Sequence, residues 1–367
     1  MENYKEELLK KIGRIPSLLP TSILLVSIYG FILLYSANGG NIQPFAYKQI
    51  VIFCILIPIV FIISIIDIKI IYQFSYIFYF ATLIILIAVT FFGKKVMGAT
   101  RWLDLGLITI QPSELVKISL ILMLSRYFHN YDNQNSSDFQ LIIPLLASIF
   151  PIMLVIKQPD LGTGMITLIV VLIMFLLAGV RLIYFILGGI SALCLMPVIW
   201  MMLHDYQRNR VLTYLNPERD PLGTGYNIIQ SKIAIGSGGL FGKGLLSGTQ
   251  GPLSFLPEYQ TDFIFSFLAE ELGFVGGVIL LILYSFIIIQ SLIIAINCKS
   301  KFARLMCAGV TSLFFSHVFI NIAMVMDLVP VVGVPLPLIS YGRTMMVSML
   351  IGFGLIMNAA VNSKSNI

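Results

Sequence analysis

Residues 255–297 read "FLPEYQTDFIFSFLAEELGFVGGVILLILYSFIIIQSLIIAIN" and combine acidic residues with a long apolar run. Two acids, Glu258 and Asp262, stand immediately before an apolar run that continues with few interruptions to Asn297. A helix needs about 20 apolar residues to cross a bilayer, so the run is longer than one crossing requires. We expect it either to tilt strongly or to begin with a helix that leaves the bilayer before re-entering.

The rest of the chain is similarly apolar. Of its 367 residues, 58% are hydrophobic and 11% are charged, and the mean hydropathy is +0.96. That composition excludes a soluble domain of this length. The apolar stretches approach the length of a membrane-spanning helix and lack the alternating pattern of a membrane β-barrel. The predicted fold class is therefore all-α, a polytopic membrane protein.

Hydropathy in a window of about 19 residues predicts ten transmembrane helices. They lie near residues 17–36, 48–66, 72–92, 108–128, 139–157, 161–179, 182–203, 263–297, 303–326 and 339–361. We interpret the first as an uncleaved span, because its apolar core is too long for a signal peptide. A single membrane domain is expected over residues 1–367.

Lysine and arginine residues indicate the orientation of the chain. An even number of spans puts both termini on one side, and basic residues crowd the N-terminal arm, residues 1–14, and the short loop 298–304. By the positive-inside rule, both termini are cytoplasmic. Residues 204–262 then form one large periplasmic loop between the seventh and eighth helices, and a loop of about 60 residues is seldom a passive connector.

Several classes of site are not supported by the sequence. The formal charge of +6 comes without a basic stripe interleaved with aromatics, which argues against nucleic-acid binding. The glycine run "GSGGLFGKG", residues 236–244, departs from the phosphate-loop pattern, so an ATP site is not warranted. Neither a disulfide framework nor a metal cluster is indicated by the scattered cysteines and histidines, which are Cys54, Cys194, Cys298, Cys307, His129, His204 and His317.

The stretch "GATRWLDLGLITIQPSELVKISL", residues 98–120, introduces the fourth span. Pro112 suits the first turn of a helix, and Glu114 and Lys117 then share one face of that helix. An ionisable pair in an apolar helix must face protein or water. The pair therefore either holds two helices together or lines a functional cavity.

Other polar residues mark helix ends and loops. In "KQPDLGTG", residues 157–164, Asp160 is placed to cap the sixth span. Arg208 and Arg210 have the guanidinium donors that suit a diphosphate, and contact with lipid headgroups is the alternative. Lys243, within the glycine run, is a further candidate cation.

The stretch "GVPLPLISYGRT", residues 333–344, places Pro335 and Pro337 ahead of Ser340 and Tyr341. Two prolines so close break a helix and expose backbone at membrane depth. Such backbone must be buried in protein or line a cavity. A simple loop before the tenth span is the alternative.

Four blocks together resemble a known family. They are "GATRWLDLG…QPSELVKI", "KQPDLGTG", "NIIQSKIAIGSGGLFGKG…GTQ…FLPE…TDFIFSFLAEELG" and "PLPLISYG". In this order, from about residue 98 to 360, they look like the signature blocks of the RodA/FtsW family of shape, elongation, division and sporulation (SEDS) proteins. The short tails and the text of the long loop look more like RodA, of cell elongation, than FtsW, of division.

The resemblance implies a peptidoglycan glycosyltransferase that polymerises lipid II on the outer face of the bacterial inner membrane. Its implied partner is a class B penicillin-binding protein, which cross-links the strands. The family's essential acid maps onto Asp262, and its cavity acid and lysine map onto Glu114 and Lys117. The other residues that we expect at the substrate site are Arg101, Asp160 and Ser340, which stand in family blocks, and Arg208, Arg210 and Lys243 as diphosphate contacts.

The implied chemistry transfers a glycan from a polyprenyl diphosphate to a sugar hydroxyl. Such a reaction needs a base for the hydroxyl and positive charge for the departing diphosphate, and we assign Asp262 as the base. A divalent cation such as Mg²⁺ or Mn²⁺ can share the diphosphate charge. Rival functions are a lipid II flippase and a non-catalytic scaffold for the penicillin-binding protein. The predicted place of Asp262 at the outer surface favours the enzyme, since transporter sites usually lie at the midplane.

Two residues depart from the family pattern. Gln260 stands where the family often has a histidine, so a His–Asp pair cannot be the machinery of this chain. Arg343 follows Gly342 where the family usually has a second glycine, which adds a cation beside the expected cavity.

Overall fold

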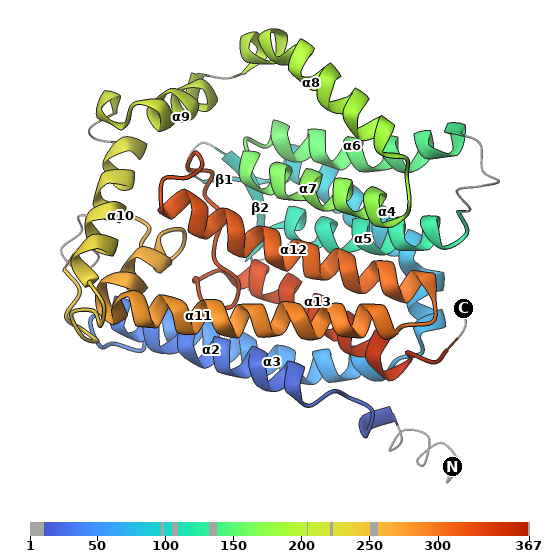
Figure 1. The fold of residues 1–367 in the computed structure, drawn as a ribbon, viewed down its shortest axis with the longest axis horizontal. Helices are drawn as coiled ribbons and strands as arrows, with labels where there is room; N and C mark the ends of the chain where they lie inside the picture. Colours follow the sequence, from blue (N-terminus) through green and yellow to red (C-terminus); the bar gives the residue numbers. More distant parts are fainter. Residues whose placement is uncertain are drawn as a thin grey trace.

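The computed structural model describes residues 11–96, 99–104, 109–131, 138–203, 205–220, 223–249 and 256–365. Most of the predicted N-terminal basic arm lies outside the described residues, as does His204. The described chain is mainly helical, and its long helices run side by side (Figure 1).

The helices of the described chain are numbered α2 to α13. Their bounds are α2 (Leu18–Ala37), α3 (Phe45–Ile65), α4 (Ile68–Phe92), α5 (Pro112–His129), α6 (Ile142–Lys157), α7 (Leu161–Leu177), α8 (Leu182–Met202), α9 (Asp205–Leu215), α10 (Thr224–Gly238), α11 (Ile264–Asn297), α12 (Lys301–Val325) and α13 (Arg343–Val361). Short 3₁₀ turns lie at Asp138–Leu141 and Pro217–Arg219.

A helix occupies each of the ten positions that hydropathy predicts. Seven described helices are long and apolar enough to cross a membrane, by length and composition. The other three are α5, which carries the Glu114 and Lys117 charges, and α7 and α8, whose apolar parts are shorter. The chain is therefore a multi-pass membrane protein.

A small antiparallel sheet was not predicted from the sequence and qualifies the all-α assignment. Its strands are β1 (Lys94–Val96), β2 (Ala99–Asp104) and β3 (Thr109–Ile110), in the order β1-β2-β3. The span predicted from residue 108 begins instead at Pro112. Proline lacks the backbone N–H of a helix interior but fits its first turn, so the chain before it is left to pair as a strand.

Helices α12 and α13 form the centre of the protein. Buried residues make up 72% of the apolar window of α12 and 83% of that of α13, against 28% in α3 and α4. Helix α13 packs against α3, and α12 packs against α5, α7 and α11. Most side chains on these two helices therefore face protein rather than lipid.

The long apolar run at residues 263–297 is interrupted at Gly273. This residue has φ 66° and ψ −164°, which divides α11 into a short first segment and a long second one. The break releases two carbonyls from the helix ladder, and both are paired again. Lys243 donates its N–H to the Glu270 carbonyl at 3.0 Å, and Gly244 donates to that of Glu271 at 2.9 Å.

The same break releases two N–H groups beyond Gly273. Phe274 donates to the Gly239 carbonyl at 2.9 Å, and Val275 donates to that of Leu240 at 3.1 Å. The glycine run 236–244 thus pairs with the broken backbone of α11. Its structural role is to supply hydrogen-bond partners for the interrupted helix. This role explains the glycines, so no phosphate ligand is needed to account for them.

Substitution of Gly273 tests this account. Gly273→Ala should lower the free energy of unfolding by about 2 kcal/mol or more, because positive φ strains any other residue. Its Cβ would also meet the Gly242 nitrogen at 2.3 Å. Gly277→Ala is the matched control in the same helix, where a Cβ would find only ordinary contacts with Phe265. Thermal unfolding in detergent compares the two, and equal shifts in Tm would contradict the proposed strain.

Candidate functional site

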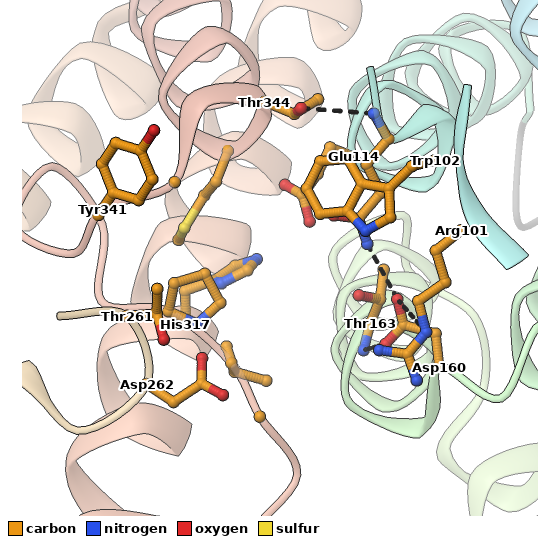
Figure 2. Close-up of a pocket in the computed structure, with 16 residues that line it drawn as sticks. Arg101, Trp102, Glu114, Asp160, Thr163, Thr261, Asp262, His317, Tyr341 and Thr344 are labelled. Atoms are coloured by element: carbon orange, nitrogen blue, oxygen red, sulfur yellow. Dashed lines mark hydrogen bonds and ion pairs between the residues drawn. The ribbon is translucent and has the colours of Figure 1, made fainter. Parts of the chain in front are cut away.

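A cavity of about 220 Å³ has the starts of α5 and α7 on one side, and on the other side α12 and the segments before α11 and α13. Figure 2 shows Asp262, His317 and Tyr341 on one side of this space, and Arg101, Trp102 and Asp160 on the other. The lining residues are Arg101, Trp102, Gln111, Glu114, Asp160, Thr163, Thr261, Asp262, His317, Gly333, Val334, Pro335, Tyr341, Gly342, Thr344 and Met345.

Asp262 projects into this cavity from the turn before α11. The N-cap of α11 is Phe263, and no side chain caps it, so Asp262 is not a helix cap. No described residue donates a hydrogen bond to its carboxylate. A Cβ on Gly333 would lie 3.2 Å from its Oδ2, so the glycine leaves room for the acid. The side chain is thus presented to whatever enters the cavity.

The environment of Asp262 alters its ionisation. It lies outside the membrane-spanning helices, half-buried at the surface of the cavity. Removal from water, followed by repulsion from Glu258, raises its pKa from 3.8 to about 7. Attraction by Arg210 opposes this rise, repulsion from Asp160 adds to it, and Arg101 opposes it. A carboxyl with a pKa near neutrality is suited to accept a proton and to release it again.

The backbone on either side of Asp262 is held by α12 and by the segment before α13. Asn321 on α12 donates its amide to the Asp262 carbonyl at 2.8 Å and to the Val334 carbonyl at 2.6 Å. The Ser340 hydroxyl donates to the Thr261 carbonyl at 2.5 Å. Two segments far apart in the sequence are therefore joined next to the acid.

The opposite wall carries an arginine and a second acid. Arg101 donates to the Gln158 carbonyl at 3.2 Å and to the Pro159 carbonyl, and its Nε lies 4.0 Å from Asp160 Oδ2. Asp160 caps α7 by accepting the Thr163 N–H at 3.2 Å, as predicted. The guanidinium is therefore directed by the end of α6 and the start of α7.

Three buried ionisable side chains lie at the base of the cavity. The Lys117 ammonium donates to Glu114 Oε1 at 2.7 Å and lies 2.8 Å from His317 Nε2. The predicted Glu114–Lys117 pair on one helix face is therefore present. It also joins α5 to α12, and Glu114 and His317 line the cavity. The pair thus lies beside the cavity and, through the contact of Lys117 with His317, at a junction of two helices.

The proline segment before α13 is irregular and buried, as predicted. Tyr284 on α11 donates its hydroxyl to the Pro337 carbonyl at 2.7 Å. Gln49 on α3 donates to the Ser340 carbonyl at 2.8 Å, and the Leu336 N–H donates to the Ser340 hydroxyl at 2.7 Å. Side chains of three helices, Asn321 included, thus satisfy a backbone that forms one wall of the cavity.

The remaining predicted site residues lie outside the cavity lining. Arg208 donates to the Trp200 and Met201 carbonyls of α8. Arg210 donates to the Val331 carbonyl at 3.1 Å and is close enough to Asp262 to influence its pKa. Lys243 pairs with Glu270 at 2.6 Å, beside the break in α11.

Two departures from the family pattern have defined places. Gln260 donates to the Tyr259 hydroxyl at 3.1 Å, and its carbonyl accepts the Tyr341 N–H at 2.9 Å. Arg343 is the first residue of α13. Neither lines the cavity.

Sequence reasoning missed several residues of the site. Trp102 directly follows Arg101 within a recognised family block, and the selection of Arg101 as a site residue pointed to Trp102 as well. His317 and Asn321 are four residues apart on α12, so they share a face. Polar residues at that spacing in an apolar span indicate a face turned to protein, and this signal was available.

The described residues include no group of three or more His, Cys, Asp or Glu side chains that could hold a metal ion. Magnesium is commonly held by one or two carboxylates together with substrate phosphates. The acids of the cavity therefore do not form a metal site by themselves.

Comparisons with known proteins identify the family of the chain. A family model described as "Cell cycle protein" and covering FtsW, RodA and SpoVE matches residues 16–365. Peptidoglycan glycosyltransferase MrdB of Escherichia coli K12 is 42% identical over 351 residues, which cover 94% of each chain.

Two solved structures share the fold. A chain from a peptidoglycan synthase complex that coordinates polymerization and crosslinking is 28% identical, with a TM-score of 0.80 over 93% of this chain and 96% of that one. Rod shape determining protein RodA of Thermus thermophilus is 26% identical, with a TM-score of 0.72 over 95% and 97% of the two chains. The family resemblance of the sequence blocks is confirmed, and the chain belongs to the FtsW/RodA/SpoVE family of cell cycle proteins.

Proposed function

We propose that this protein is a peptidoglycan glycosyltransferase that polymerises lipid II into glycan strands during cell elongation. The observation that carries the proposal is the Asp262 carboxylate, which projects into the cavity with its pKa raised to about 7. Its Escherichia coli relative bears the same activity in its name. An acid of this kind at the edge of a membrane protein suits a reaction between a lipid-linked sugar and a growing chain.

Asp262 acts as the general base. The 4-hydroxyl of an N-acetylglucosamine attacks the anomeric carbon of the donor sugar, and the bond from that carbon to the diphosphate breaks with inversion. Asp262 takes the hydroxyl proton, and the polyprenyl diphosphate leaves with the bonding electrons. Because no described residue donates a hydrogen bond to the carboxylate, its oxygens are available to the substrate hydroxyl.

Positive charge near the base stabilises the departing diphosphate. Arg101 lines the cavity, and Arg210 lies close enough to Asp262 to lower its pKa. These two guanidiniums are therefore favoured over Arg208 and Lys243, which contact α8 carbonyls and Glu270. A divalent cation bound with the diphosphate would supply further charge.

The protein crosses the bacterial inner membrane ten times, with both termini in the cytoplasm. Residues 204–262 form the large periplasmic loop, which contains α9 and α10 and ends at Asp262. The partner is a class B penicillin-binding protein, which docks through its single membrane helix and its periplasmic stalk. The related chain in a peptidoglycan synthase complex supports this pairing.

Purified protein given lipid II in detergent tests the function directly. Without a bilayer, a flippase or a scaffold makes no glycan, whereas a polymerase makes chains. Asp262→Asn should fold and yet lose activity by roughly 10²–10⁴-fold, because the amide cannot accept the hydroxyl proton. Asp67→Asn is the matched control, since Asp67 only caps α4 and asparagine caps equally well. Near-normal polymerisation by Asp262→Asn would leave the chemistry unassigned.

The pH dependence gives a second test of the base. A general base works only when it is deprotonated, so the rate should fall as the pH drops below about 7. Glu258→Gln removes a like charge that raises the pKa of Asp262. The acid limb of the pH–rate profile should therefore move to lower pH. Glu218→Gln, also exposed, should leave the profile unchanged, and a shift of the same size in both variants would refute the assignment.

Cysteine labelling tests the topology. In a variant without its native cysteines, Asn209→Cys should react with an impermeant reagent added outside the cell. Lys301→Cys and Lys364→Cys should react only after the membrane is opened, because the positive-inside rule puts them in the cytoplasm. Labelling of Lys301→Cys from outside would reverse the predicted orientation.

A further inference from the structure

The base of the cavity offers hydrogen-bonding atoms that the protein itself does not use. Glu114 is 4% exposed and His317 is 1% exposed. Glu114 Oε2 and His317 Nδ1 are both buried and have no hydrogen-bond partner among the described residues. Buried polar atoms are nearly always paired in proteins, so two unpaired atoms on residues that line one cavity are available to a molecule bound there.

Lys117 determines which of these atoms donates. An ammonium group has donors only, so His317 Nε2 must accept from it, and the proton of the neutral ring lies on Nδ1. The Pro335 backbone makes a hydrogen-bond-like approach to the ring, and since proline has no N–H, the approaching group is its carbonyl. The contact falls short of full hydrogen-bond geometry, so Nδ1 has no complete partner and can still donate to a better-placed acceptor. The base of the cavity therefore presents one acceptor, Glu114 Oε2, and one donor, His317 Nδ1–H.

This arrangement discriminates between the parts of a lipid-linked sugar. A diphosphate has acceptors only, and the Glu114 carboxylate would repel it. A hydroxyl can pair with both atoms but has no apolar part. The cavity also has apolar lining from Val334, Pro335 and Met345. A group that combines an N–H, a carbonyl and a methyl matches all three features.

We propose that the base of the cavity binds the acetamido group of an N-acetylated sugar. The amide N–H donates to Glu114 Oε2, the amide carbonyl accepts from His317 Nδ1–H, and the methyl contacts the apolar lining. His317 is thus a specificity residue, and Lys117 sets its tautomer. This inference rests on the proposed function, because it takes the substrate to be the disaccharide of lipid II, which carries two acetamido groups.

Substrates with single changes test the proposal. Purified protein in detergent is given natural lipid II and two analogues, each with one of its two sugars deacetylated. One analogue should be used roughly 10- to 100-fold less efficiently, as kcat/KM, because a buried donor or acceptor is left unpaired. The affected analogue identifies which sugar is bound. Failure to polymerise natural lipid II would sink the proposed function, whereas equal use of all three substrates would overturn only this inference.

Variants of His317 show whether that residue makes the distinction. His317→Leu should reduce the preference for the acetylated substrate to a few-fold or less, while a purely structural role would slow all substrates by the same factor. His317→Gln introduces an amide that can both accept and donate, and it should retain part of the preference. This variant replaces His317→Leu in the test if His317→Leu does not fold. Thr311→Val on the same helix is the control, since Thr311 bonds only to the Cys307 carbonyl. An unchanged preference in a folded His317 variant would overturn the proposal.

Discussion

The Asn321 side chain is the interaction on which the site depends. Its amide joins the carbonyl of Asp262, just before α11, to the carbonyl of Val334, in the segment before α13. Both segments have left the helical conformation, so their carbonyls lack helix partners. One buried side chain satisfies both and sets the distance between them. One turn earlier on the same helix, His317 lines the inner end of the cavity. Helix α12 therefore positions both Asp262 and the buried end of the site.

The same constraint applies wherever a helix is broken. A buried polar group without a partner costs about 1–3 kcal/mol, so the groups exposed at each break need hydrogen-bond partners from elsewhere in the protein. Tyr284 and Gln49 supply them for the proline segment, and the glycine run 236–244 supplies them for the break at Gly273. Irregular backbone in a membrane protein is tolerated where it is enclosed in this way, and here that enclosed backbone forms a wall of the cavity.

How far the sequence predicted this structure depends on the range of each interaction. Helix positions followed from hydropathy, and the Glu114–Lys117 pair and the Asp160 cap followed from spacings of three residues. The contacts of Lys117 with His317 and of Asn321 with Asp262 join residues 200 and 59 positions apart. No local pattern encodes such pairings. The sheet was missed because its strands are short, and hydropathy does not distinguish them from the start of a span.

The position of Asp262 just before a membrane helix is explained by comparison with Glu114. Both carboxylates line one cavity, but their surroundings assign them different roles. Glu114 lies inside the bundle, where an isolated charge would be very costly, and Lys117 holds one of its oxygens at 2.7 Å. That pairing satisfies one oxygen of Glu114 and leaves the second without a partner among the described residues. Asp262 lies just outside the spans, where partial burial raises its pKa to about 7 without a bonded cation to hold it ionised. In the proposed reaction Asp262 can return its proton to water after each transfer, because its side chain is only half-buried.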